Sequence, residues 1–198
     1  MDRISQLDAI IEQFNLNKHP FYQDWRMGTL PVNKLQAYAT EYQAFVGTIA
    51  QGWETVGENH YAEEERFHEL LWTKFKTEIG AAGQANLSST ETLVTAANNL
   101  FGSSVEALGA LYAFEAQQPH TSRSKLDGLI EHYTVSEDAQ EYFKVHADDL
   151  AEAELIREKV KAMSDEEFAR TKNACAVVCS AMWGALDGIY YAREAVLA

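Results

Sequence analysis

The strongest constraint on the fold is a stripe of apolar side chains that recurs every three or four residues between positions 35 and 53. This spacing places one face of an α-helix against a core, and most side chains on that face are aromatic: Leu35, Tyr38, Tyr42, Phe45, Ile49 and Trp53. Similar stripes follow along the chain, which has only three prolines and almost no alternating β-branched runs. The sequence therefore predicts an all-α fold, with residues 1–198 forming a single bundle of about seven or eight helices.

Start and stop signals predict where these helices lie. Two segments have the pattern of a capping box, 88–91 and 164–167, and each is expected to begin a helix. Pro119 is expected to end the helix that contains Glu115. Residues 19–28 are expected to be irregular, and the helices are expected at about 3–15, from 31 to beyond 53, at 58–79, from 88 to near 102, up to 118, at 121–132, at 136–161 and from 165 to the C-terminus.

The net charge excludes several classes of partner. The formal charge is −14, whereas a nucleic-acid partner needs clustered lysine and arginine, and an anionic membrane surface repels an acidic protein. No apolar run reaches the roughly 20 residues that span a bilayer, and the N-terminus lacks the pattern of a signal peptide. We therefore expect a cytoplasmic protein that binds neither nucleic acid nor membrane. Cys175 and Cys179 are expected to be small buried residues.

Three of the predicted helices carry a metal-competent group on a mostly apolar face. Glu115 shares its face with leucines and a tyrosine, and a lone buried carboxylate needs a compensating partner. Glu65 and His68 form Glu-x-x-His, which directs a carboxylate and an imidazole to one side of a helix. His146 lies among aromatic residues, with Asp149 about one turn further on.

Each of these groups also has an ordinary structural explanation. A histidine on an apolar face is often a hydrogen-bonded core residue, and the run 63–65 could be a solvated helix face. Glu115 could accept a hydrogen bond from a tyrosine or an arginine. One shared metal site would satisfy Glu115, His68 and His146 together. Carboxylates with a minority of imidazoles are typical of non-haem iron or manganese sites in helix bundles. Spacing alone leaves Glu64 as an alternative to Glu65.

Four segments, 19–28, 35–42, 63–72 and 110–119, resemble the TenA/PqqC superfamily, and within it the CADD-like group of haem-oxygenase-like di-iron oxidases. The resemblance extends over about residues 17–192. It implies a seven-helix haem-oxygenase-like fold, a homodimer, and an active site inside the bundle that holds one or two irons. The ligand chemistry leaves manganese as the alternative metal.

The resemblance also implies a ligand set, which this chain matches only in part. In the di-iron branch, three core helices supply a glutamate plus a histidine, a glutamate, and a His-x-x-x-Asp-x-x-His set. His68, Glu115 and His146 fall on family positions. The first family glutamate falls on Tyr61, so that Glu65 or Glu64 would have to serve instead.

The third set departs further from the family pattern. Its expected aspartate and second histidine fall on Leu150 and Ala153. Asp149 is therefore the expected substitute, with Glu152 a poorer one, and the second iron is in question. The tyrosine that usually precedes the helix glutamate is Phe114 here, so synthesis of p-aminobenzoate is not expected.

These observations predict an O2-dependent oxidase or oxygenase that acts on a small metabolite such as an amino acid, an amine or a carboxylate. Glu115, Tyr38 and Tyr42 are expected to be catalytic. Tyr38, Tyr42 and Phe45 are expected to form the wall of the substrate pocket, with Tyr22, Trp25 and Arg26 as nearby substrate contacts. Two alternatives stay open. One is metal-free catalysis in the same pocket, with Glu115 as a general base. The other is a ligand-binding or partner-binding homologue that has lost its metal ligands.

Overall fold

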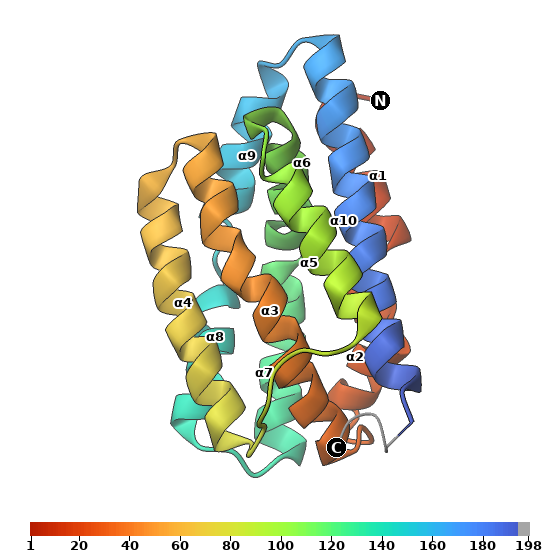
Figure 1. The fold of residues 1–198 in the computed structure, drawn as a ribbon, viewed down its shortest axis with the longest axis vertical. Helices are drawn as coiled ribbons and strands as arrows, with labels where there is room; N and C mark the ends of the chain where they lie inside the picture. The colour runs from red at the N-terminus through yellow and green to blue at the C-terminus, as the bar shows by residue number, and fades with distance from the viewer. Residues whose placement is uncertain (194–198) are drawn as a thin grey trace.

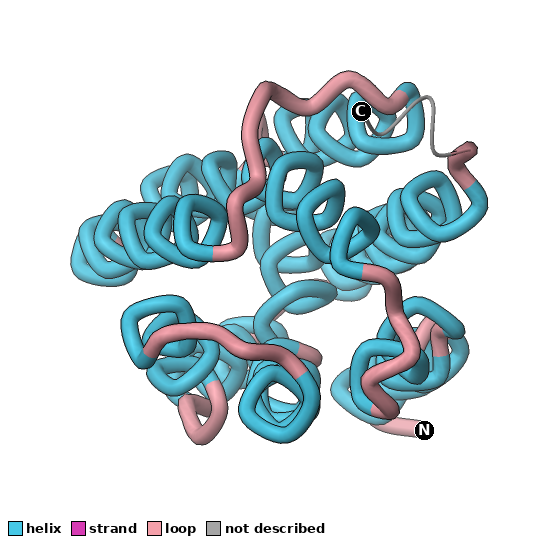
Figure 2. The backbone as a smooth tube through the Cα atoms, turned by 90° about the horizontal axis from the view of Figure 1, so that it is seen from below, coloured by secondary structure: helices cyan, strands magenta, loops and turns pink. Residues whose placement is uncertain are grey.

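The computed structural model describes residues 1–193, which form ten α-helices and one short 3-10 helix and contain no strand (Figure 1). The predicted all-α bundle is confirmed. Figure 2, which looks along the bundle, shows most of the helices nearly end-on. In chain order the helices are α1 Arg3–Gln13, η1 Leu16–Lys18, α2 Pro20–Arg26, α3 Val32–Val56, α4 Asn59–Glu78, α5 Ser88–Leu100, α6 Ser104–Glu115, α7 Gln118–His132, α8 Glu137–His146, α9 Ala151–Lys161 and α10 Asp165–Tyr191.

The central helix of the bundle is α6. Every residue from Ala107 to Glu115 is buried, which is the pattern of a helix that has neighbours on all sides. Helices α3, α5, α9 and α10 pack around it (Figure 1). It lies directly against α10 at Gly109, where an added Cβ would lie 2.0 Å from the carbonyl oxygen of Thr171. Only a glycine allows the two helices to lie this close.

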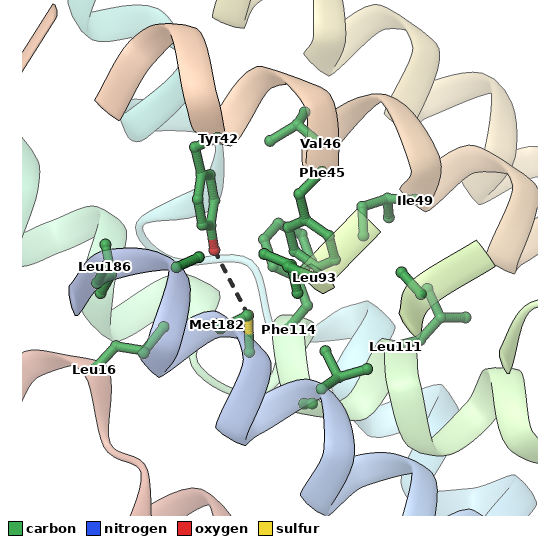
Figure 3. Close-up of a cluster of buried hydrophobic side chains, with 14 of the residues drawn as sticks. Leu16, Tyr42, Phe45, Val46, Ile49, Leu93, Leu111, Phe114, Met182 and Leu186 are labelled. Atoms are coloured by element: carbon green, nitrogen blue, oxygen red, sulfur yellow. Dashed lines mark hydrogen bonds between the residues drawn. The ribbon is translucent and has the colours of Figure 1, made fainter. Parts of the chain in front are cut away.

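The aromatic stripe of α3 faces the core, as its spacing predicts. Tyr38, Phe45, Ile49 and Trp53 are fully buried, and Leu35 and Tyr42 nearly so. Figure 3 shows the middle of this face, where the Phe45 and Phe114 rings lie beside each other with centroids 5.4 Å apart. In the same view the Tyr42 hydroxyl points to the sulfur of Met182, at 3.6 Å.

Two expectations about local structure are wrong. Residues 19–28 are not irregular, because Pro20 begins α2 and the His19 ring nitrogen Nδ1 accepts from the backbone N–H of Phe21. The segment from Ser88 begins a helix without forming a capping box. The Glu41 carboxylate instead accepts from the two N–H groups that precede α5. The second predicted capping box, at Ser164, is confirmed.

The predicted single helix over 136–161 is also wrong, since α8 ends at His146 and α9 begins at Ala151. Between them the Asp149 side chain accepts from the N–H of Ala151 at 2.9 Å. An aspartate that hydrogen-bonds the backbone two residues on favours a turn over a continuing helix. The break changes which residues of α9 face the interior.

Two further features concern α7 and α10. Pro119 does not simply end the Glu115 helix, because it lies in the first turn of α7, where its missing N–H is tolerated. By length and composition α10 is the one described helix that could cross a membrane. Its inner face packs in the core of the bundle, where Cys175, Cys179 and Leu186 are fully buried.

Candidate metal centre

Helix α4 contributes Glu65 and His68 to the interior. Glu65 is 1% exposed, and its Oε1 lies 2.9 Å from Nδ1 of His68, one turn further along the helix. Its second oxygen, Oε2, is buried without a hydrogen-bond partner. Glu64 instead lies on the outer side, with its side chain 44% exposed and 3.6 Å from His60. Burial therefore favours Glu65 over Glu64 as the candidate ligand.

His146, the last residue of α8, presents a free nitrogen lone pair to the same place. Its Nδ1 lies 2.6 Å from the carbonyl oxygen of Tyr142, and a contact with a carbonyl requires Nδ1 to carry the proton. Its Nε2 is therefore an acceptor, and it is buried without a partner. Burial, followed by the neighbouring His68 at a ring separation of 4.3 Å, lowers the pKa of His146 to about 3. The ring is thus neutral near pH 7, which is the form that binds metals.

Glu115 ends α6 and faces the same interior region. Its Oε1 accepts from the indole N–H of Trp53 at 3.1 Å, and its Oε2 has no donor. Burial, followed by the carboxylates of Glu152 and Glu65, raises the pKa of Glu115 well above 4.5. Burial and then Glu65 likewise raise the pKa of Glu152 to about 9. These carboxylates therefore destabilise one another when they are ionised.

The five side chains form two groups that share one member. Ligand atoms of Glu65, His68 and His146 lie within 4.8 Å of one another, and so do those of Glu65, Glu115 and Glu152. A cation would offset the repulsion between the buried carboxylates and would satisfy the unpartnered atoms of Glu65, Glu115 and His146. The donor set of oxygens with a minority of imidazoles fits non-haem iron or manganese.

Asp149 does not join these groups, contrary to expectation. Its side chain is on the surface, where it accepts from the N–H of Ala151, the first residue of α9. Of the two positions where the family pattern places ligands, Leu150 is 51% exposed and Ala153 is buried. The metal-competent residue that α9 places inside is Glu152, whose carboxylate lies with those of Glu65 and Glu115 after the break that follows His146.

Most of the predicted pocket residues form one buried aromatic cluster. The Tyr22 and Tyr38 hydroxyls are 2.8 Å apart, the Tyr38 ring stacks on Tyr42 at 4.9 Å, and the Trp25 ring lies 5.4 Å from Tyr38. Burial raises the pKa of all three tyrosines, which keeps them as neutral phenols. Arg26, which was expected as a nearby substrate contact, is exposed and does not join this buried cluster.

A short ring-to-ring path joins the aromatic cluster to the candidate ligands. The Trp72 ring lies 5.7 Å from Tyr42 and 4.7 Å from Tyr142. The Tyr142 ring in turn lies 4.3 Å from that of His146. The predicted substrate residues of α3 therefore border the metal-competent groups through Trp72 and Tyr142.

Sequence reasoning missed Lys125, a buried cation on α7. It is 2% exposed, its Nζ donates to the Tyr38 hydroxyl at 3.3 Å, and it lies 5.0 Å from the centre of the Tyr22 ring. Burial lowers its pKa to about 7. The signal was available, because Lys125 is four residues before Leu129 and so falls on the apolar stripe of α7.

Comparison with known proteins assigns the family. The family model described as iron-containing redox enzyme matches residues 35–179, which is most of the chain. The chain belongs to this family of oxidoreductases. The model of the TENA/THI-4/PQQC family matches residues 4–53. A relative from Nitrosomonas europaea, named 4-aminobenzoate synthase, is 30% identical over 93% of this chain and 89% of its own length. A relative of the same name from Chlamydia muridarum is 26% identical over 94% of this chain and 89% of its own length.

Solved structures show the same fold at low identity. A protein with a haem-oxygenase-like fold from Shewanella denitrificans superposes with a TM-score of 0.81, at 19% identity over 96% of this chain and 92% of its own. A TenA homologue from Pseudomonas syringae has a TM-score of 0.76 at 17% identity, over 96% of this chain and 93% of its own. A CADD-like protein from Nostoc punctiforme has a TM-score of 0.69 at 19% identity, covering 94% and 92%. The expected resemblance and the haem-oxygenase-like fold are confirmed.

Proposed function

We propose that this chain is an O2-dependent oxidase that holds iron at Glu65, His68, Glu115, His146 and Glu152. The observation that carries the proposal is the convergence of three buried, unpartnered ligand atoms, which are Oε2 of Glu65, Oε2 of Glu115 and Nε2 of His146. Leaving such atoms unsatisfied costs about 1–3 kcal/mol each, and a bound cation removes that cost.

Iron supplies the one-electron chemistry that lets a spin-paired organic substrate react with O2, and the protein prepares the site for it. The carbonyl of Tyr142 holds the proton of His146 on Nδ1 and so presents Nε2. The indole of Trp53 fixes one oxygen of Glu115 and leaves the other free. The rings of Trp72 and Tyr142 exclude water on the side of the aromatic cluster.

The metal-free alternative fits the site less well. Metal-free catalysis would leave Oε2 of Glu65, Oε2 of Glu115 and Nε2 of His146 buried without partners, and it gives the two imidazoles beside these carboxylates no role. The binding-protein alternative rested on the loss of ligands at Leu150 and Ala153, and Glu152 supplies a carboxylate in their place. Iron at this site accounts for the buried charges without a second assumption.

The substrate is proposed to be a small amine, amino acid or carboxylate, and formation of 4-aminobenzoate is the specific reaction that the relatives favour. The relatives with this name align over nearly the whole chain. The expectation against this reaction depended on Phe114, which packs against Phe45 in the apolar cluster of Figure 3 and outside both ligand groups. Growth of a 4-aminobenzoate auxotroph that expresses the chain tests this product directly.

The oxidase itself is tested by O2 consumption after anaerobic loading with ferrous iron. Loaded wild-type protein is expected to consume O2, and His146→Ala and Glu115→Ala are expected to reduce this to the background of free iron. Asp149→Asn is the matched control, because its carboxylate is on the surface. O2 uptake that is equal in the metal-free protein, or unchanged in His146→Ala, would contradict the proposal. A homodimer and a cytoplasmic location stay predictions from the sequence.

A further inference from the structure

Two aromatic side chains, one on α3 and one on α4, connect a candidate ligand to the surface. The indole N–H of Trp53, a fully buried residue, donates to Oε1 of Glu115 at 3.1 Å. The Trp53 ring lies 4.9 Å from the ring of Tyr61, with 34° between the two planes. Tyr61 is half-buried, and its ring lies 5.6 Å from that of His60, whose side chain is 78% exposed. A line of contacts therefore runs from Glu115 to solvent through one tryptophan and one tyrosine.

Tryptophan and tyrosine are among the side chains that most readily lose a single electron. Electron transfer between two rings in contact is fast, because tunnelling falls steeply with distance. We propose, building on the oxidase function, that Trp53 and Tyr61 form an electron relay through which a one-electron donor at the surface reduces the oxidised centre. The relay gives Tyr61 a role although this position supplies no ligand to either group of metal-competent residues.

The relay differs from the other aromatic route in where it ends. The other route leads from His146 through Tyr142 and Trp72 to Tyr42, and these three aromatic side chains are all 4% exposed or less. A donor in solution reaches none of them directly. Solvent does reach Tyr61, which makes it the point where an electron can enter.

The steps balance in electrons and protons. The Trp53 indole gives one electron to the oxidised centre and keeps its N–H, because Oε1 of Glu115 accepts that hydrogen and stabilises the resulting cation. Tyr61 then returns one electron to Trp53 and releases its phenolic proton to water, which leaves a neutral radical on Tyr61. The donor supplies one electron to this radical, and a proton from water restores the phenol. One electron passes from the donor to the centre, and both side chains end unchanged.

The charges around Tyr61 indicate the class of donor. Burial, followed by the carboxylates of Glu152, Glu64 and Asp149, raises the pKa of Tyr61, so the resting side chain is a neutral phenol. Asp149 is exposed, and the Glu64 side chain is partly exposed. An acidic surface of this kind attracts cations and repels anions. The donor is therefore a positively charged one-electron reductant.

The test is freeze-quench EPR of iron-loaded protein that is mixed with O2 without a donor. Wild type is expected to accumulate a tyrosyl radical, identified by the narrower spectrum of protein made with deuterated tyrosine. Tyr61→Phe, and Trp53→Phe loaded to the same iron content, are expected to lack this signal. Tyr191→Phe is the matched control and should keep it, because Tyr191 is an exposed tyrosine of α10. Hexaammineruthenium(II), a cationic one-electron donor, should remove the wild-type signal faster at low salt than at high salt.

The outcomes separate the relay from the oxidase. A tyrosyl radical that persists in Tyr61→Phe would overturn the relay and leave the oxidase intact. So would the absence of a tyrosyl radical in wild type that binds iron and consumes O2. Loaded wild type that consumes no O2 would overturn the oxidase and the relay together. Decay with hexaammineruthenium(II) that does not depend on salt would overturn the assignment of a cationic donor. Iron per chain, measured in each variant before mixing, separates loss of the relay from loss of iron.

Discussion

Replacement of Glu152 by glutamine should stabilise the metal-free protein, and should do so more strongly as the pH rises. The pKa of Glu152 is about 9 in the folded chain against 4.5 for an ordinary glutamate, because burial and then Glu65 disfavour its charge. A group whose pKa is raised on folding stabilises the fold most below its unfolded pKa. That contribution is lost as the pH rises from 4.5 towards 9.

The magnitude follows from proton linkage. Each pH unit inside this window costs the wild type about 1.4 kcal/mol of unfolding free energy, whereas glutamine does not titrate. Between pH 5 and pH 8 the upper limit is therefore about 4 kcal/mol. Relaxation and water entry around buried charges reduce such values, so we expect Glu152→Gln to gain roughly 2 kcal/mol over wild type across this interval.

The assay is urea denaturation of both proteins in EDTA at several pH values. Glu158→Gln is the control, because Glu158 is an exposed residue of the same helix. The difference between Glu152→Gln and wild type should grow from pH 5 to pH 8, while that of the control should stay flat. A Glu152→Gln effect that does not change with pH would refute the claim that Glu152 is a buried, repelled carboxylate.

Three further outcomes are expected. Gly109→Ala should lower the melting temperature by several degrees, because its Cβ would meet a backbone carbonyl oxygen at 2.0 Å. Gly184→Ala is the control, because a Cβ there meets nothing within 4 Å. Equal melting temperatures for the two variants would contradict the close contact between α6 and α10. Lys125→Met should raise the unfolding free energy at pH 7, because burial lowers the pKa of Lys125 to about 7 and so disfavours its charged form. This gain over wild type should shrink as the pH approaches 10.5. Urea denaturation of both proteins at pH 7 and pH 10 measures the gain and its decrease. Trp53→Phe should weaken iron binding about 10-fold or more, because Oε1 of Glu115 loses the indole N–H that orients the carboxylate. An unchanged iron affinity in a chelator competition would refute this orienting role of Trp53.

The parts of the site that lie within single helices could be predicted from the sequence. Glu65 and His68 are three residues apart, and helical geometry alone places them side by side. Glu115 and His146 stand on strongly apolar faces, which made their burial predictable. In each case the information is local, since the period of the helix determines the direction of the side chain.

The parts that depend on a break or on packing could not be predicted. Asp149 was expected as a ligand and Glu152 as a poorer one because the helix was extrapolated past His146. A side-chain hydrogen bond to the N–H of Ala151 ends that continuity and reverses the two roles. Arg26 and Lys125 differ in this respect. The exposure of Arg26 depends on how the neighbouring helices pack, whereas the position of Lys125 on the apolar stripe of α7 was visible in the sequence and was overlooked.

The most direct test of the proposed metal centre is a crystal structure of protein loaded with ferrous iron under anaerobic conditions, with anomalous data collected on both sides of the iron edge. Iron at this centre predicts anomalous density bounded by Glu65, His68 and His146, with a second peak beside Glu115 and Glu152 if the centre holds two ions. Crystals of the loaded protein that show no anomalous peak between these side chains, or iron only at the surface, would contradict the proposed metal centre.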